Sequence, residues 1–192
     1  MERRDDPCDH IAQGYVDCTI ALGSEHRLMA GDIARVEVVV HPLARAVMFE
    51  PCTLRYAPSN GWSARWRMPF NMAVALVDHG VTIDSYSDER ARDASTRAFM
   101  ERVMPLVDPS LPLPQHYPAA LRVHTADGRV LDRRQIHVAG SPENPMPREE
   151  YDLKFVDNAR RSLDAGKVGA LLLSMRDLPN LTNMAHVAAL YT

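Results

Sequence analysis

The side chains that could do chemistry in this sequence are scattered, and few of them share a motif. Eight histidines are present, but no two stand in an H-E-x-x-H or comparable metal-binding spacing. Cys8 and His10 form a Cys-x-His pair that we interpret as incidental, because it lies close to the start of the sequence, where chain ends fray. Ser141 stands outside a G-x-S-x-G elbow, and no glycine-rich phosphate loop occurs. We therefore predict no metal site and no cofactor.

One pair of arginines is better placed for binding. Arg65 and Arg67 flank Trp66 directly before an apolar stretch that begins at Met68. A guanidinium group can hold a carboxylate through two parallel hydrogen bonds, so this pair is a candidate anion site. An arginine that is solvated or stacked on an aromatic ring is the alternative interpretation, and it is the commoner outcome for such a pair.

Composition excludes several classes of partner. The net charge of −3 is spread along 192 residues without a block of like charge, so we expect neither a nucleic-acid groove nor a basic membrane-binding face. The odd cysteine count, at Cys8, Cys18 and Cys52, is typical of reduced thiols rather than a disulfide framework. The start of the sequence lacks the apolar run of a signal peptide, and no segment reaches the length of a membrane span. We predict a cytoplasmic protein, and we expect the given sequence to begin partway through a longer protein.

The elements that must position these side chains can be placed from hydrophobic periodicity and turn residues. The stretch "RMPFNMAVALVDHG" predicts a core helix from about Pro69 to His79, because proline suits a first helical turn and Gly80 suits the position just past the end. Its side chains are apolar on almost every side, so we expect it to be covered rather than to lie on a surface.

Further elements follow on both sides of this helix. "IAQGYVDCTIALGSEHRL" predicts a first helix, and "ARVEVVVHPL" predicts a strand ended by Pro42. A helix is expected from Ser87 to about Val103, with four buried side chains: Ala94, Ala98, Phe99 and Val103. The five prolines of "MPLVDPSLPLPQHYP" predict an irregular or edge-like segment. A hairpin is expected around Ala126-Asp127-Gly128, then a helix after Pro147 and two short helices broken near Pro179.

This order of elements predicts an α+β fold, a small antiparallel sheet with a hairpin packed by helices. We place one α+β domain over residues 1–165 and a helical tail over residues 166–192. By themselves these patterns predict a domain and no specific activity.

Three segments together resemble the carboxy-terminal portion of the MmgE/PrpD family. They are "PCDHIAQGYVDC" (7–18), "SARWRMPFNMAVALVDHGVTIDSYSDE" (63–89) and "DGRVLDRRQIHVAGSPENPMPREEYDLKF" (127–155), in the order and spacing of that family. The family includes 2-methylcitrate dehydratase, cis-aconitate decarboxylase and iminodisuccinate epimerase. The resemblance implies a lid domain with final helices that return to a larger helical domain, and an active site between the two.

The resemblance also implies where functional groups should lie. Arg4 stands near a lysine that is frequent in the family, and Gln13 stands at the place of a frequent histidine, although an amide cannot take up a proton at neutral pH. These two are weak candidates for catalytic positions. The start of the core helix, from Arg65 to Phe70, would face the cleft between domains, which makes Arg65, Arg67 and Phe70 candidates for substrate binding. The family's Ser-Leu-Pro-Tyr is here Arg67-Met68-Pro69-Phe70, so both hydroxyl groups are absent.

The function implied is that of a lid-domain subunit or fragment of a lyase or isomerase acting on small di- or tricarboxylates, of the 2-methylcitrate dehydratase type. We expect it to be inactive without a helical-domain partner, because the resemblance places most catalytic groups there. The alternative is a non-catalytic remnant that binds a partner or a small acid. Either a homo-oligomer or a separate helical partner would cover an apolar patch that we expect at Leu171–Leu173 and from Leu181 to Tyr191.

Overall fold

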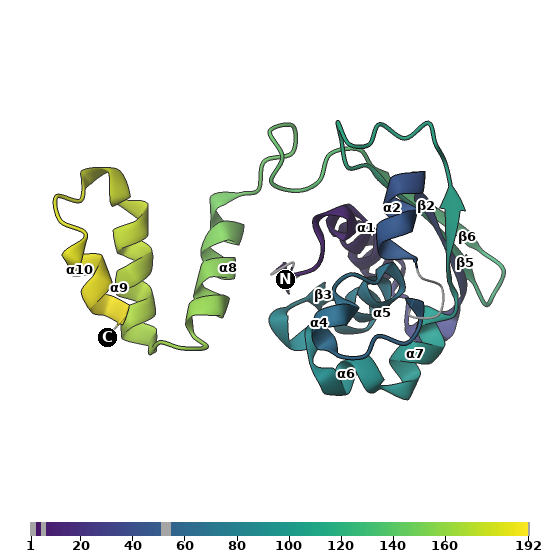
Figure 1. Cartoon of the computed structure of the whole chain (residues 1–192), viewed down its shortest axis with the longest axis horizontal. Helices are drawn as coiled ribbons and strands as arrows, with labels where there is room; N and C mark the ends of the chain where they lie inside the picture. The colour runs from purple at the N-terminus through teal and green to yellow at the C-terminus, as the bar shows by residue number, and fades with distance from the viewer. Residues whose placement is uncertain (1–2, 5–6, 51–54, 192) are drawn as a thin grey trace. The chain divides into compact units, whose positions relative to one another are not determined.

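The computed structural model describes residues 3–4, 7–50 and 55–191, and the chain forms two compact units (Figure 1). The first comprises residues 1–145 and the second residues 146–192, and each is described by itself. Cys52 lies outside the described residues. Within the described ranges, no helix has the length and apolar character needed to cross a membrane. The domain boundary expected between residues 165 and 166 stays a prediction.

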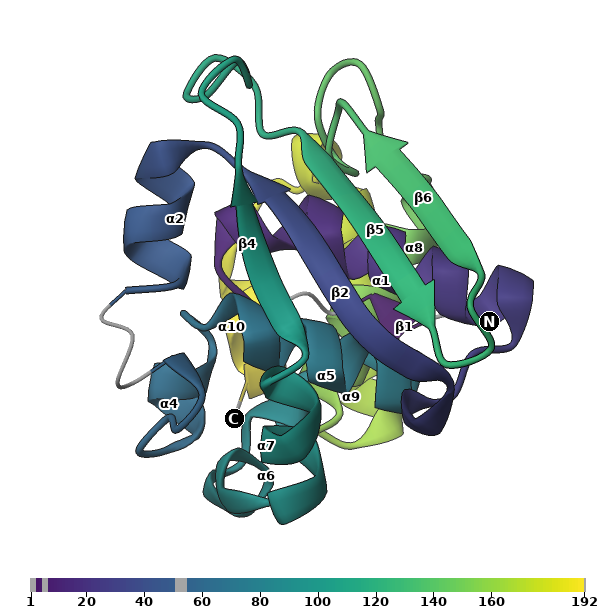
Figure 2. The same ribbon diagram turned by 90° about the vertical axis from the view of Figure 1, so that its right-hand side faces the viewer.

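The first unit is built on a four-stranded sheet in the order β4-β2-β5-β6 (Figure 2). Its strands are β2 (Ile33–Val40), β4 (Val103–Val107), β5 (Ala119–Thr125) and β6 (Val130–Gln135). The α+β class is confirmed, and so is the β5–β6 hairpin, whose turn contains Gly128 at φ 87°. The prediction of an antiparallel sheet is wrong for one pair: β2 and β4 are parallel, so the sheet is mixed. A long helical connection separates them and lets the chain return in the same direction.

The edge strand β4 is protected against pairing with another chain. Val36 N donates to Arg102 O and Asp108 N donates to Val40 O, so even-numbered residues of this segment bond to β2. Pro105 therefore has its missing N–H on the outer edge, where a proline does not break the sheet. The hydroxyl of Tyr56 donates to Val103 O at 3.0 Å. The edge-like character predicted for the proline-rich segment is confirmed, and Pro105 and the Tyr56 contact each remove one group that could pair with another strand.

Two helices cover one face of the sheet, α1 (His10–His26) and α5 (Met68–Asp78) (Figure 2). The core position of α5 is confirmed, since every residue from Met68 to Leu76 is buried, whereas Val77 is 47% exposed. The left-handed residue that ends α5 is His79, at φ 49°, and not the expected Gly80. Gly80 instead begins the short strand β3 (Gly80–Val81), which pairs in parallel with β1 (Arg3–Arg4).

The expected helix from Ser87 to Val103 is wrong in its length. Ser87 does cap a helix, but α6 (Asp88–Arg92) ends at Asp93, whose carboxylate accepts from Thr96 N at 2.7 Å and so starts α7 (Ala94–Met100). Of the four side chains expected to be buried, Phe99 and Val103 are buried and both alanines are exposed. The sequence patterns also missed α2 (Pro42–Met48), α4 (Gly61–Ala64) and the turns of 3-10 helix at Ala30–Asp32 and Ile83–Tyr86.

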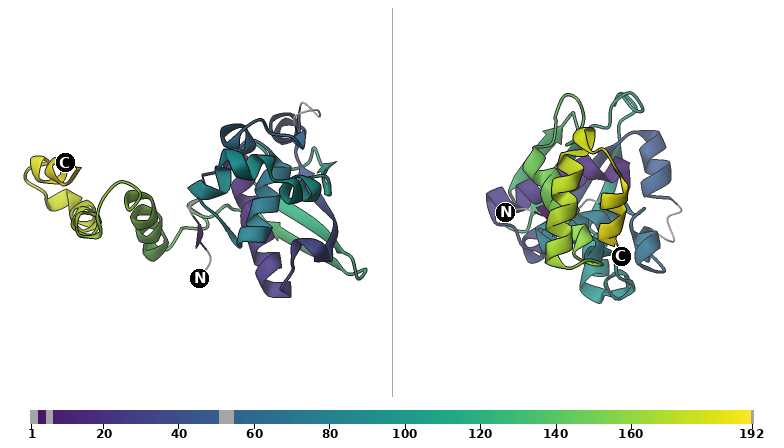
Figure 3. Two further views of the ribbon diagram at one scale, coloured as in Figure 1. Left: turned by 90° about the horizontal axis from the view of Figure 1, so that it is seen from below. Right: turned by 90° about the vertical axis from the view of Figure 1, so that its left-hand side faces the viewer.

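The second unit is helical, with α8 (Arg148–Ala159), α9 (Ala165–Arg176) and α10 (Ala185–Ala188). Single turns of 3-10 helix at Leu178–Asn180 and Ala189–Tyr191 flank α10, so the break near Pro179 is confirmed. The helices α9 and α10 lie side by side (Figures 1 and 3). In the expected apolar patch, Leu173 is 64% exposed and Tyr191 63%, but Leu171 is buried and does not contribute to it.

One glycine offers a test of this packing. A Cβ at Gly61 would lie 1.7 Å from the backbone oxygen of Tyr86, which cannot rotate away. We expect Gly61→Ala to lower the free energy of unfolding by about 3 kcal/mol, at the upper end of overpacking effects. Gly31→Ala is the matched control, because a Cβ there meets nothing within 4 Å. Urea unfolding of both variants checks this, and equal stability for the two would contradict the packing at Gly61.

Candidate functional site

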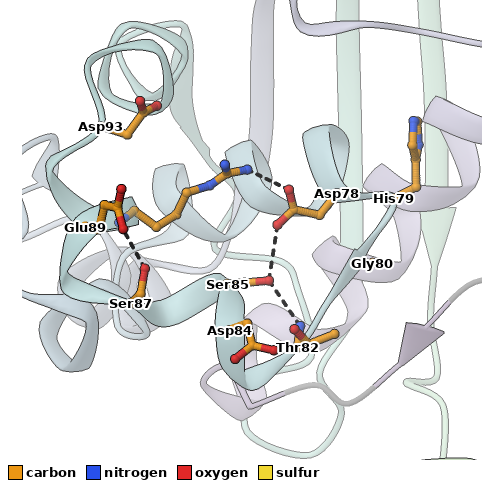
Figure 4. Close-up of a pocket in the computed structure, with 10 residues that line it drawn as sticks. Asp78, His79, Gly80, Thr82, Asp84, Ser85, Ser87, Glu89 and Asp93 are labelled. Carbon is orange, nitrogen blue, oxygen red and sulfur yellow. Dashed lines mark hydrogen bonds and ion pairs between the residues drawn. The ribbon is translucent and has the colours of Figure 1, made fainter. Parts of the chain in front are cut away.

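Two hollows in the first unit have room for a small acid, and the larger lies at the end of α5 (Figure 4). Its volume is about 620 Å³, and we call it the acidic pocket. The residues that line it are Asp78, His79, Gly80, Thr82, Asp84, Ser85, Ser87, Glu89, Arg90 and Asp93. With four carboxyl groups against one arginine, it has the wrong charge for a carboxylate ligand.

Much of the polar lining of the acidic pocket is already engaged in the fold. Asp78 accepts from Arg90 Nη2 at 2.6 Å and from the hydroxyl of Ser85 at 3.2 Å, and Ser85 in turn accepts from Thr82 N (Figure 4). The pKa of Asp93 is lowered to about 2, because its carboxylate accepts hydrogen bonds from the hydroxyl of Ser95 and from the backbone N–H and hydroxyl of Thr96. These contacts join the end of α5 to α6 and α7, which is a structural role.

The second hollow has a volume of about 500 Å³ and contains three histidines, so we call it the histidine pocket. It lies where the start of α1 meets the loops at one end of the β5–β6 hairpin. The residues that line it are His10, Gln13, Gln115, His116, Tyr117, Ile136, His137, Val138, Ala139, Gly140, Ser141, Pro142 and Glu143. Among the described residues, this lining includes no lysine or arginine.

The first turn of α1 supplies one wall of the histidine pocket. Asp9 caps the helix by accepting from Ile11 N at 2.9 Å, which fixes the direction in which the turn begins. His10 and Gln13 are three residues apart and therefore neighbours on one face, with 3.0 Å between His10 Nδ1 and Gln13 Oε1. The His10 ring packs edge-on against Tyr117, with 4.5 Å between the ring centroids.

The hairpin supplies the opposite wall. Ala119 pairs with Gln135 at the open end of the hairpin, so the residues just before β5 lie beside those just after β6. The rings of His116 and His137 consequently meet edge to face, with 5.5 Å between centroids. Glu143 approaches His137 from the following loop, with 3.8 Å between Oε2 and Nδ1. The spacing of histidines along the sequence gave no hint of this cluster. A hairpin centred on the Asp127-Gly128 turn places position 117 opposite position 137. This strand register is the sequence signal that could have predicted the cluster.

Chemically, the histidine pocket offers three imidazole rings together with amide and hydroxyl hydrogen-bonding groups. The nearby thiol and phenol of α1 are not available for such chemistry. Burial raises the pKa of the Cys18 thiol to about 12, although the Arg133 guanidinium opposes this effect. Burial also raises the pKa of Tyr15 well above its usual range, and its hydroxyl donates to Val39 O at 2.7 Å. Within the described ranges, no set of three or more His, Cys, Asp or Glu side chains is arranged to hold a metal ion.

The candidates for catalytic positions have different outcomes in the structure. Gln13 lies in the histidine pocket, bonded to His10. Arg4 belongs to β1 through its backbone, and its side chain lies outside what the structure describes. His10, His116 and His137 were not selected from the sequence, and they are the groups that the fold gathers around Gln13.

The arginine pair lies elsewhere, around the start of α5. The Arg65 guanidinium stacks over the rings of Trp62 and Tyr86, at 5.1 and 5.5 Å from their centroids. Arg67 Nη1 donates to Glu50 O at 2.8 Å, and burial lowers the pKa of its guanidinium. Phe70 is fully buried against Tyr86. The two arginines are thus engaged in the fold, while the substrate-binding role of Arg65, Arg67 and Phe70 stays a prediction.

Comparison with known proteins gives one finding. The family model for the MmgE/PrpD C-terminal domain matches residues 7–178 of the chain. The match includes both walls of the histidine pocket and the start of α5. No curated protein matches the sequence.

The role of Arg67 can be measured through stability. Because its guanidinium donates to Glu50 O, we expect Arg67→Ala to lower the free energy of unfolding by about 1.5 to 3 kcal/mol, the usual range for a hydrogen bond to a charged group. Arg45→Ala is the control, since Arg45 forms an exposed ion pair with the same residue, Glu50, and such pairs contribute less than about 1 kcal/mol. Urea unfolding with and without citrate distinguishes the roles. Unchanged stability with weaker citrate binding would instead support the binding role.

Proposed function

The chain belongs to the MmgE/PrpD family, and from this premise we propose that it is the lid-domain part of a lyase or isomerase acting on small di- or tricarboxylates. The reaction we favour is of the 2-methylcitrate dehydratase type, in which a proton next to a carboxylate is removed. The cytoplasmic location predicted from the cysteines is part of the same proposal.

The observation that carries this proposal is the histidine pocket itself. Removal of a proton next to a carboxylate needs a positioned base whose protonation changes near neutral pH, and histidine is the side chain suited to this. His10, His116 and His137 line one hollow of about 500 Å³, which is in the size range of small-molecule sites. Gln13, the position implied by the family resemblance, lies in the same hollow.

Within the pocket we assign proton transfer to His137. Its Nδ1 lies 3.8 Å from Glu143, and this carboxylate would compensate the positive charge that the ring gains when it takes a proton. His10 is oriented by Gln13 and by the Tyr117 ring, so it is suited to hold a carboxylate group of the substrate. His10 would then supply a group that the amide of Gln13 cannot, since an amide neither takes up nor releases a proton at neutral pH.

The lining also explains why we expect this chain to be inactive alone. Two or three substrate carboxylates need fixed positive charge as negative charge develops at the reacting carbon. The described lining of the histidine pocket provides histidines but no lysine or arginine, and it includes the negative Glu143. We infer that a separate helical-domain partner contributes these cations. A homo-oligomer in which a second copy contributes them is the other arrangement consistent with the proposal.

The first test is turnover. We expect the purified chain to convert neither cis-aconitate nor 2-methylcitrate above a buffer blank, and to gain activity when the helical domain of a family member is added as a separate polypeptide. Product formation followed by chromatography checks both parts. Turnover by the chain alone would contradict the need for a partner, and failure with every helical domain tried would favour the non-catalytic remnant.

The second test is binding. We expect citrate to bind in the histidine pocket, because its carboxylates can accept hydrogen bonds from the imidazole and amide N–H groups there. His10→Ala should weaken binding by about tenfold, which is about 1.4 kcal/mol and close to the lower end of what a hydrogen bond to a charged group contributes. His186→Gln, an exposed histidine of α10, is the control. Isothermal titration calorimetry of both variants checks this, and equal affinities for the two would contradict citrate binding in the pocket.

A further inference from the structure

A buried carboxylate lies behind the histidine pocket. Asp17 is on α1 and only 5% exposed, although aspartate is rarely buried to this degree. It comes one helical turn after Gln13 and two turns after His10, so the three residues share one face of α1. The carboxylate is therefore on the helix that forms one wall of the pocket, but it is not among the residues that line the pocket.

The side chain of Gln135 connects this carboxylate to the opposite wall. Its Nε2 donates to Asp17 Oδ2 at 3.2 Å and also to the backbone oxygen of His137 at 3.0 Å. Gln135 is the last residue of β6, so the connection runs from α1 through the end of the hairpin to the histidine two positions further on. Because one amide nitrogen donates to both oxygens, the bond to Asp17 orients the Gln135 side chain for its contact with the His137 backbone.

The loop that follows His137 is closed on itself. Asn144 Nδ2 donates to the same His137 oxygen at 3.1 Å, and Gly140 N donates to Asn144 O at 2.8 Å. Ser141 N also donates to Val138 O at 3.1 Å. These bonds connect the His137 backbone to the segment that contains Glu143, so an anchor on the His137 backbone also helps to position Glu143.

We propose that Asp17 is a positioning residue of the histidine pocket, which sets the place of His137 relative to His10 and Gln13 through Gln135. This inference deepens the proposed function and rests on it for the identity of the ligand. The alternative is that Asp17 only stabilises the packing of α1. That alternative predicts lower stability for its variants without any change at His137.

The test uses three substitutions and one control in the full chain. Asp17→Ala removes the acceptor and Gln135→Leu removes the donor, while Asp17→Asn keeps an oxygen acceptor of the same shape and so should rescue the contact. Thr19→Val is the control, because Thr19 is also buried on α1 and its hydroxyl donates to Tyr15 O, away from the pocket. The imidazole C–H signals of His137 in NMR spectra are the first measurement. Citrate affinity at pH 6 is the second, and melting temperature the third.

We expect Asp17→Ala and Gln135→Leu each to shift and broaden the His137 signals and to weaken citrate binding by about tenfold, with Asp17→Asn within about twofold of the parent. The double variant should be no worse than either single one, since both remove the same link. Thr19→Val should lower the melting temperature and leave the His137 signals unchanged.

If Asp17→Ala lowers the melting temperature but leaves the His137 signals and citrate affinity unchanged, as expected for Thr19→Val, the inference is overturned. Should the parent chain bind no citrate while the His137 signals still respond to Asp17→Ala, the positioning role stands and the proposed ligand fails. Gln135→Leu gives the same information if Asp17→Ala does not fold.

Discussion

Helix α1 passes so close to the end of the β5–β6 hairpin that a side chain at position 14 would be crowded. A Cβ at Gly14 would lie 3.0 Å from the Cβ of Ala119 and 3.3 Å from Val138 Cγ1, closer than side chains normally pack. A glycine at this point lets the helix rest directly on β5, and the residues one turn to either side then meet the hairpin as well. The histidine pocket on one side, and the Asp17–Gln135 link on the other, both depend on this contact.

The rest of the first unit supports this contact. The helix α5 is buried along nine successive residues, and β2 alternates buried and partly exposed side chains beside it, so the centre of the unit is an apolar core with little polar content. Polar groups are concentrated where elements end. There the chain leaves β4 for the proline-rich segment, or leaves β6 for the loop of His137. A rigid core with functional groups on the connecting loops is the common arrangement of binding sites on such scaffolds.

The two hollows differ more in the charge of their lining residues than in their volume. The acidic pocket is the larger, at about 620 Å³ against about 500 Å³, yet its carboxylates repel the ligand class that the family handles, and Asp78 and Asp93 hold helices together. The histidine pocket has three imidazole rings and one nearby carboxylate. It lacks lysine and arginine in its described lining, and for this reason our proposal includes a partner that contributes them.

The sequence by itself determined the elements whose signal is local. Proline before an apolar run placed the start of α5 within a residue, alternating valines placed β2, and Asp127-Gly128 placed the hairpin, because periodicity and turn chemistry act over a few residues. The sequence also identified the family through three separated segments. Only the tertiary structure decided that β4 runs parallel to β2 and that His10, His116 and His137 line the same hollow as Gln13, since strand register and helix packing bring together residues that are far apart in the sequence. It likewise decided that Arg67 donates to a backbone oxygen. Local patterns carry no information on which acceptor group will lie within reach, because that depends on how close the elements approach.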